Sequence, residues 1–197
     1  QYAFNRMRRV AQLCASAFIN VGTLRQLGRL AVSIEAAEDK MSLVIARFRQ
    51  FGRESNTLQQ VYQLSQRLGT SLDETASGMT RLLVATKSLG TSQKDLLKVQ
   101  ENIIVLARAG GTSTEELVGG MRQLSQGLAS GRLQGEELRS VLENIPLVAL
   151  EIADELDVPI GKIRELAAEG KITGDVVINA LKEIGINFED LPQTFAQ

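Results

Sequence analysis

A short phrase that combines a helix-ending glycine with a helix-starting serine occurs three times at a fixed interval. It reads LGTSLDE at residues 68–74, LGTSQKD at 89–95 and GGTSTEE at 110–116, so that its glycines lie 21 residues apart. Glycine adopts the positive φ that ends many helices, and a serine hydroxyl can accept a free backbone N–H at the start of the next one. The phrase therefore predicts that one helix stops and another begins at each occurrence.

Acidic side chains complete the helix-start signal after each serine. In a capping box the serine hydroxyl accepts a hydrogen bond from the backbone N–H three residues on, and the acidic side chain there reaches back. The pairs are Ser71 with Glu74, Ser113 with Glu116 and, as a weaker form, Ser92 with Asp95. We therefore expect helices of about 17 residues, each about 25 Å long, running antiparallel to their neighbours. Their expected ranges are 72–88, 92–109 and 114–130.

Apolar residues recur at the same interval and should mark the buried faces of these helices. Two such columns are Ala76, Leu97 and Val118, and Leu82, Ile103 and Leu124. Within the third helix, one apolar stripe consists of Leu117, Met121, Leu124 and Leu128. Three copies fit hairpins in an ordinary bundle better than a long solenoid. We predict an all-α domain of about eight to ten short helices, packed as antiparallel hairpins with a quasi-repeat of about 21 residues.

Composition supports a helical core and excludes several kinds of function. Only 4% of the 197 residues are aromatic and none is Trp, so the core must be mainly aliphatic. The stretch MSLVIARF at 41–48 is the one candidate strand. The chain has no histidine, which removes the commonest general base, the usual partner of a nucleophile and most zinc sites. Cys14 is the only cysteine, so no internal disulfide can form. We expect no enzyme activity, no cofactor and no metal.

Charge and hydropathy give no general attraction to nucleic acid or membranes. The net charge is −1, so no global field draws the chain to anionic partners. The stretch at 6–24, with its basic start, resembles a signal peptide, but we take this likeness to be accidental. Its uncharged part at 10–24 is too short to span a membrane, which needs about 20 residues. We expect it to form a buried or partner-facing helix. Because the sequence begins with Gln, we also expect it to belong to a longer chain.

The segment 147–170 has the outline of a helix-turn-helix, which makes a DNA-binding regulator the alternative function. A recognition helix must present basic or amide side chains to bases and phosphates. This segment offers Lys162 and Arg164, against the acids Glu151, Asp154, Glu155, Asp157, Glu165 and Glu169. The acidic excess would repel DNA, so two helices packed at an angle are the preferred interpretation.

Two longer segments carry a resemblance to a known family. They are QLSQGLASGRLQGEELRSVLENIP at 123–146 and IADELDVPIGKIRELAAEGKIT at 152–173. Together with the upstream phrases SLGTSQKDL and GGTSTEEL, they resemble the amino-terminal domain of tape measure proteins from long-tailed bacteriophages and related tail-like particles. The resemblance covers roughly 50–182. One departure is Asp157, where the family often has a glycine in a turn.

The resemblance implies a structural role in the virion tail. Proteins of this family lie inside the growing tail tube, fix tail length through a long helical middle and leave with the DNA at infection. The implied partners are tail-tube, tail-tip or initiator proteins and tail assembly chaperones, with self-association as a further option, and assembly takes place in the cytoplasm of the bacterial host. From the charge of the chain and the lack of an apolar run long enough to span a membrane, we expect no sequence-specific contact with nucleic acid and no membrane contact in this segment.

The helix breaks restrict which part of such a protein this chain can be. A ruler needs long uninterrupted helices, whereas this chain is broken about every 21 residues, so we expect a compact end domain that acts as an anchor. The expected organisation is a helical arm at 1–50, the domain at 51–184 and a linker at 185–197. The candidate interaction surface consists of Gln123, Gln126, Arg132, Gln134, Glu136, Glu137 and Arg139. The alternative, that these polar side chains are merely solvated, stays open.

Overall fold

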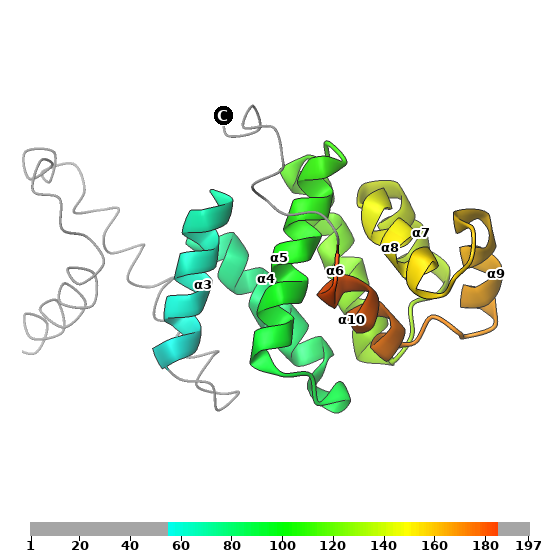
Figure 1. Ribbon diagram of the computed structural model, residues 1–197, viewed down its shortest axis with the longest axis horizontal. Coiled ribbons are helices and arrows are strands. Elements are labelled where there is room, and N and C mark those ends of the chain that lie inside the picture. The colour runs from blue at the N-terminus through cyan, green and yellow to red at the C-terminus, as the bar shows by residue number, and fades with distance from the viewer. Residues whose placement is uncertain (1–54, 185–197) are drawn as a thin grey trace, which may run out of the picture. The chain divides into compact units, whose positions relative to one another are not determined.

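The computed structural model describes residues 55–184, which form eight α-helices and two short 3-10 helices (Figure 1). The α-helices are α3 (Ser55–Leu68), α4 (Leu72–Ala85), α5 (Gln93–Ala109), α6 (Thr114–Ser130), α7 (Gly135–Asn144), α8 (Pro146–Glu155), α9 (Ile163–Ala168) and α10 (Gly174–Lys182), and the 3-10 helices are η2 (Lys87–Leu89) and η3 (Ile160–Lys162). Within this range the only β pairing is an isolated bridge between Arg132 and Thr173, so the all-α prediction is confirmed. The segments expected at 10–24, 41–48 and 185–197 lie outside the described residues.

The helix starts follow the capping pattern of the sequence. Ser71 and Ser113 each accept the backbone N–H of the glutamate three residues on, and that glutamate accepts the serine N–H in return, so both capping boxes are complete. The Ser92 hydroxyl accepts the Asp95 N–H at 3.1 Å and donates to the Asp95 carboxylate at 2.8 Å, without a bond back to its own N–H. The predicted helix at 114–130 is α6, and that at 92–109 is α5 with one residue fewer. The predicted helix at 72–88 ends earlier and is followed by η2.

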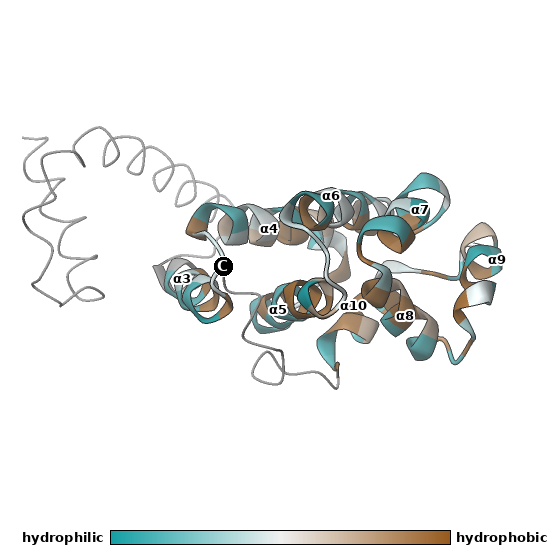
Figure 2. Cartoon of the chain, turned by 90° about the horizontal axis from the view of Figure 1, so that it is seen from above, coloured by the Kyte–Doolittle hydropathy of each residue, from teal (hydrophilic) through white to brown (hydrophobic). Residues whose placement is uncertain are grey.

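The helices form two layers with their apolar faces turned inward (Figure 2). One layer contains α4, α6 and α7, and the other contains α3, α5, α10 and α8. From α3 to α6, consecutive helices alternate between the layers. As a result, α6 packs mainly against α4 and α7 rather than against α5, its neighbour in sequence.

Polar contacts between α3 and α5 fix their relative direction. The Gln93 amide donates to Gln60 Oε1 at 2.6 Å, and the Arg67 guanidinium lies 2.9 Å from the Glu101 carboxylate. Residue numbers increase in the same direction along both helices between these two contacts. The two helices therefore run parallel, side by side in one layer.

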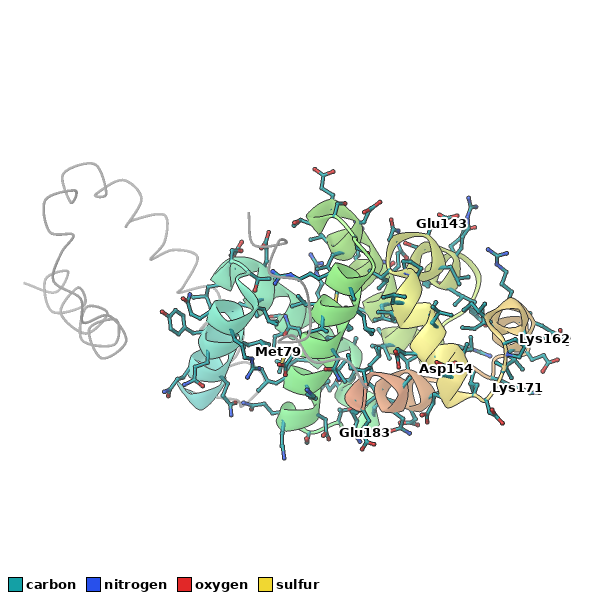
Figure 3. The ribbon with its side chains drawn as sticks, turned by 45° about the horizontal axis from the view of Figure 1, so that its top comes forward. Met79, Glu143, Asp154, Lys162, Lys171 and Glu183 are labelled. Carbon is teal, nitrogen blue, oxygen red and sulfur yellow. The ribbon has the colours of Figure 1, made fainter. Side chains whose placement is uncertain are left out.

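The core lies between the layers and confirms one of the two apolar columns. Leu82, Ile103 and Leu124 are fully buried. The second column is only partly buried, because Val118 is 42% exposed and its predicted burial is wrong. The stripe of α6 that contains Leu117 and Leu124 faces the core, and Val118 is turned about 100° away from Leu117 on the helix. Figure 3 shows charged side chains such as Glu143, Lys162 and Glu183 projecting outward.

The last helix is fixed to the middle of the domain by a buried amide. Asn102 of α5 is 1% exposed, and its Nδ2 donates to the carbonyls of Leu181 at 2.7 Å and Lys182 at 3.2 Å. These carbonyls belong to the final turn of α10, where helical partners are missing. The bonds therefore satisfy the end of α10 and hold it between α5 and α8.

Candidate protein-interaction surface

The turn between α6 and α7 is held by backbone hydrogen bonds to the segment that precedes α10. Gly131 ends α6 with a φ of 87°, which favours glycine. The Leu133 N–H donates to the Ile172 carbonyl at 2.8 Å, and the Gly174 N–H donates to the Gly131 carbonyl at 3.1 Å. The polar turn at 131–134 therefore has a fixed backbone in this domain.

The seven residues of the candidate surface are mostly solvent-accessible, but they do not share one set of neighbours. The exposed ones are Gln126, Arg132, Gln134, Glu136 and Arg139, and the half-buried ones are Gln123 and Glu137. They come from the second half of α6, the turn and the first half of α7. Their role in binding stays a prediction.

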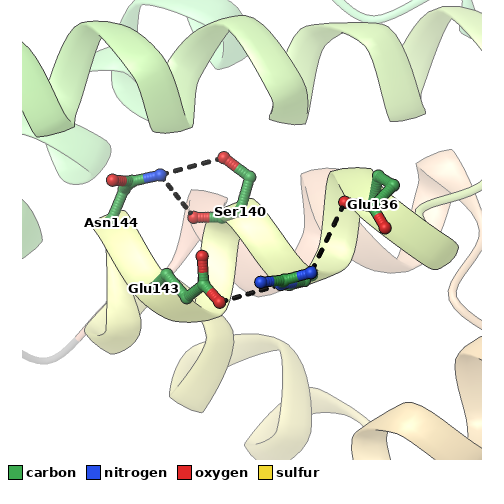
Figure 4. Close-up of polar contacts among 5 residues, drawn as sticks. Glu136, Ser140, Glu143 and Asn144 are labelled. Atoms are coloured by element: carbon green, nitrogen blue, oxygen red, sulfur yellow. Dashed lines mark hydrogen bonds and ion pairs between the residues drawn. The ribbon is translucent and has the colours of Figure 1, made fainter.

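Arg139 forms its contacts within α7. Its Nε donates to Glu143 Oε1 at 2.9 Å, and its Nη1 lies 4.0 Å from Glu136 Oε2. The hydrogen bond to Glu143, together with the negative charges of Glu143 and Glu136, raises the pKa of Arg139 above its ordinary value. Figure 4 shows the contacts of both glutamates, and also the bonds that the Asn144 amide donates to the Ser140 carbonyl and hydroxyl. Sequence reasoning missed Glu143, although its i,i+4 spacing from Arg139 is a recognisable pairing signal.

Arg132 and Gln126 lie away from the α7 contacts of Arg139, each beside a different part of the domain. A Cβ placed on Gly170 would lie 3.1 Å from Arg132 Nη1, so the guanidinium covers the turn after α9. Gln126 instead lines a hollow between α4 and α6. The structure therefore divides the predicted surface into an α7 part, a part near Gly170 and a part beside α4.

The hollow beside α4 contains functional candidates that the sequence analysis did not single out. It has a volume of about 570 Å³, and its lining includes Arg81 and Val84 of α4 together with Arg122 and Gln126 of α6. The 21-residue repeat could have predicted this hollow. Helices two intervals apart lie in the same layer, so the exposed positions of α4 and α6 belong to one surface.

The segment proposed as a helix-turn-helix forms α8, η3 and the six-residue helix α9. The turn occurs at Asp157, which has a φ of 52°, so aspartate adopts the left-handed conformation expected of a glycine there. Lys162, one of the two cations of the segment, lies 2.8 Å from the carboxylate of Glu165. Burial, and then the charge of Asp154, raises the pKa of Glu151. A six-residue helix is about 9 Å long, and this geometry does not favour a recognition helix.

The described residues were also compared with what a membrane-spanning helix and a metal site require. No helix in residues 55–184 has the length and apolar character needed to cross a membrane. Within the same residues, Asp, Glu and Cys side chains nowhere gather in a group of three or more that could hold a metal ion.

Comparison with known proteins supplies the identity that the geometry alone leaves open. The chain matches the family described as tape measure protein over residues 25–197. Comparisons with curated proteins and with solved structures gave no match. The family match includes the whole described domain and extends upstream of residue 50, where the resemblance drawn from sequence motifs ends. Since the match covers most of its length, the chain belongs to the tape measure protein family.

Proposed function

We propose that the domain formed by residues 55–184 anchors its tape measure protein to the tail initiator or tail tip. As a member of this family the protein is a structural component of a phage tail and interacts with other tail proteins, and the family is structural rather than enzymatic. The anchoring role is the finer claim. In this proposal the domain docks onto other tail proteins, and other parts of such a protein determine tail length.

The observation that carries this proposal is the shortness of the helices. The longest α-helices in the described range have 17 residues, which corresponds to about 25 Å. Drawn out as one helix, residues 55–184 would instead extend about 195 Å. Because residues 55–184 fold into two layers of short helices, the domain is much shorter than that and presents a folded surface. Such a surface suits docking, whereas a ruler requires extension.

The partners proposed for this anchor are tail-tip or initiator proteins, the tail tube and tail assembly chaperones, and assembly is proposed to occur in the host cytoplasm. The polar surface of α6 and α7 is one candidate contact. Reversing Arg132 and Arg139 to glutamate tests it, since a partner that contacts them would be lost and the yield of tails would fall. A folded variant that gives the normal yield would remove this surface from the proposal.

An in-frame deletion of residues 55–184 in the phage that encodes the protein tests the anchoring role. We expect few or no tails, because the tape measure protein could not join the complex that starts assembly. Electron microscopy of lysates gives both the number and the length of tails. A normal number of tails, each shorter by about 195 Å, would show that these residues are part of the ruler and would refute the proposal.

A further inference from the structure

Two adjoining hollows lie between helices α4 and α6 and are called here the α4–α6 trough. Residues near the start of both helices, among them Thr70 and Thr114, line one hollow of about 330 Å³. The C-terminal halves of the same helices line the hollow of about 570 Å³. Ser77 and Arg81 line both hollows, so the two hollows adjoin at these α4 residues. Because the starts of both helices line one hollow and their C-terminal halves line the other, α4 and α6 run parallel. Figure 2 shows them side by side in one layer.

The larger hollow is positively charged. Arg81 and Arg122 line it from opposite walls, and its lining contains no acidic residue. Both side chains are exposed, and neither takes part in an ion pair within residues 55–184. The acids Asp73 and Glu74 line only the other hollow. In a chain of net charge −1, two arginines that face one groove and form no ion pair with any described residue favour a negatively charged occupant.

Apolar side chains lie along the same trough. Val84, 53% exposed, lines the larger hollow, and Val118, 42% exposed, lines the smaller one. They are the two most exposed of the large apolar side chains in the described range. Small residues, Ala85 and Ala129, line the larger hollow together with Val84, so a partner can approach the helix backbones closely there. An occupant must therefore carry apolar groups as well as acids.

The form of the trough favours a helical occupant. Addition of an extended peptide as a strand requires an open sheet edge, and residues 55–184 contain no sheet. A groove between two parallel helices accepts a third helix at an axial distance of about 8–10 Å. The 14 residues of α4 correspond to a wall of about 21 Å, or about four turns of helix.

We propose that the α4–α6 trough binds an acidic amphipathic helix of another phage tail protein. The apolar stripe of that helix contacts Val84 and Val118, and its carboxylates pair with Arg81 and Arg122. The inference rests on the proposed anchoring role, since it names the surface and the chemistry through which the domain docks.

The first test reverses the charge of the trough. The full protein carrying Arg81→Glu with Arg122→Glu is expressed by the phage, and complete tails are counted by electron microscopy. We expect the number of tails to fall at least about tenfold, because two ion pairs become repulsive contacts. The matched control, Lys94→Glu with Arg164→Glu, makes the same change of net charge at two exposed residues outside the trough, and its tail number should stay normal. Circular dichroism melting of both variants must show an intact fold.

The outcomes separate this inference from the anchoring role. If deletion of residues 55–184 abolishes tails while the folded trough variant assembles them at the normal number, the trough proposal is wrong and the anchoring role stands. If the deletion gives normal numbers of shorter tails, the anchoring role itself fails. A loss of tails in the control variant that equals the loss in the trough variant also overturns the trough proposal.

The second test identifies the occupant. A photoreactive amino acid replaces Val84 in the full protein, with the same replacement at the exposed Ile160 as control, and crosslinked peptides from assembling tails are sequenced. We expect adducts within an acidic amphipathic segment of another tail protein. Adducts within this chain, with a second copy of it or with a basic segment would overturn the proposal, as would a yield no higher than that at position 160.

Discussion

Gln100 shows how closely the two layers approach at the residue scale. Its side chain is 1% exposed, and its Nε2 donates to the Thr75 carbonyl at 2.6 Å. Its Oε1 is buried and has no hydrogen-bond partner among the described residues. A Cβ on Gly78 would lie 2.7 Å from Nε2, so the glycine leaves the space that the amide occupies. A buried acceptor without a partner costs stability.

Replacing Gln100 with Met should therefore keep or raise the free energy of unfolding. Methionine is similar in length, and the substitution removes the unpaired buried oxygen, which we expect to stabilise the fold by up to about 1 kcal/mol. Urea unfolding of the full chain measures the change. The control Gln100→Glu introduces a buried charge and should be strongly destabilising. A loss of more than about 2 kcal/mol in the Met variant would mean that the amide makes an essential bond.

Glu116 gives a pH-dependent test of the α6 cap. Hydrogen bonds from the Ser113 hydroxyl, and then from its backbone N–H, lower the pKa of Glu116 below its ordinary value. A lowered folded-state pKa means that the carboxylate stabilises the fold above the ordinary glutamate pKa, and that this contribution is lost as the pH falls through the lowered value. The variant Glu116→Gln should melt earlier than the parent at neutral pH and approach it in acid. An equal difference at about pH 7 and pH 3 would contradict this account of the cap.

At the scale of the element, two adjacent glycines of α6 have different surroundings. A Cβ on Gly120 would lie 2.9 to 3.2 Å from three side-chain atoms of Ile145, the residue between α7 and α8. A Cβ on Gly119 would have nothing within 4 Å. Gly120 therefore permits the close approach of α6 to Ile145, whereas Gly119 has no packing role.

The pair predicts opposite effects of the same substitution. Gly119→Ala should raise the free energy of unfolding by about 0.5–1 kcal/mol, because alanine favours the helix. Gly120→Ala should lower it by about 1–2 kcal/mol, because the methyl group overpacks against a buried branched side chain. Denaturant unfolding of both variants compares them directly. Equal effects of the two substitutions would show that α6 and Ile145 do not pack as described.

The elements differ in how far the sequence could predict them. Caps depend on residues within one turn, which is why Ser71 and Ser113 located helix starts correctly. The direction in which a side chain points depends on the layer that its helix joins, and this is a non-local property. Val118 was therefore misassigned to the core, although Leu117 beside it was placed correctly.

At the scale of the whole domain, alternation between layers converts a linear repeat into a surface. Alternate helices run parallel in the same layer, α3 and α5 on one side and α4 and α6 on the other. Of the seven surface residues predicted from sequence, only Gln126 lines the larger hollow of the α4–α6 trough. Arg81 and Arg122 lie on different helices, and only the tertiary fold brings them to one trough. The family could be recognised without the tertiary fold, because the turn motifs that carry the resemblance are local in sequence.

An anchor made of residues 55–184 must be a folded block that contributes little to tail length. A tandem duplication of these residues within the tape measure protein tests this most directly, with tail lengths measured by electron microscopy. A compact domain of this size has a diameter of about 40 Å, so the tails that form should lengthen by no more than that. Tails longer by about 195 Å, the length of the same residues as one helix, would contradict the account.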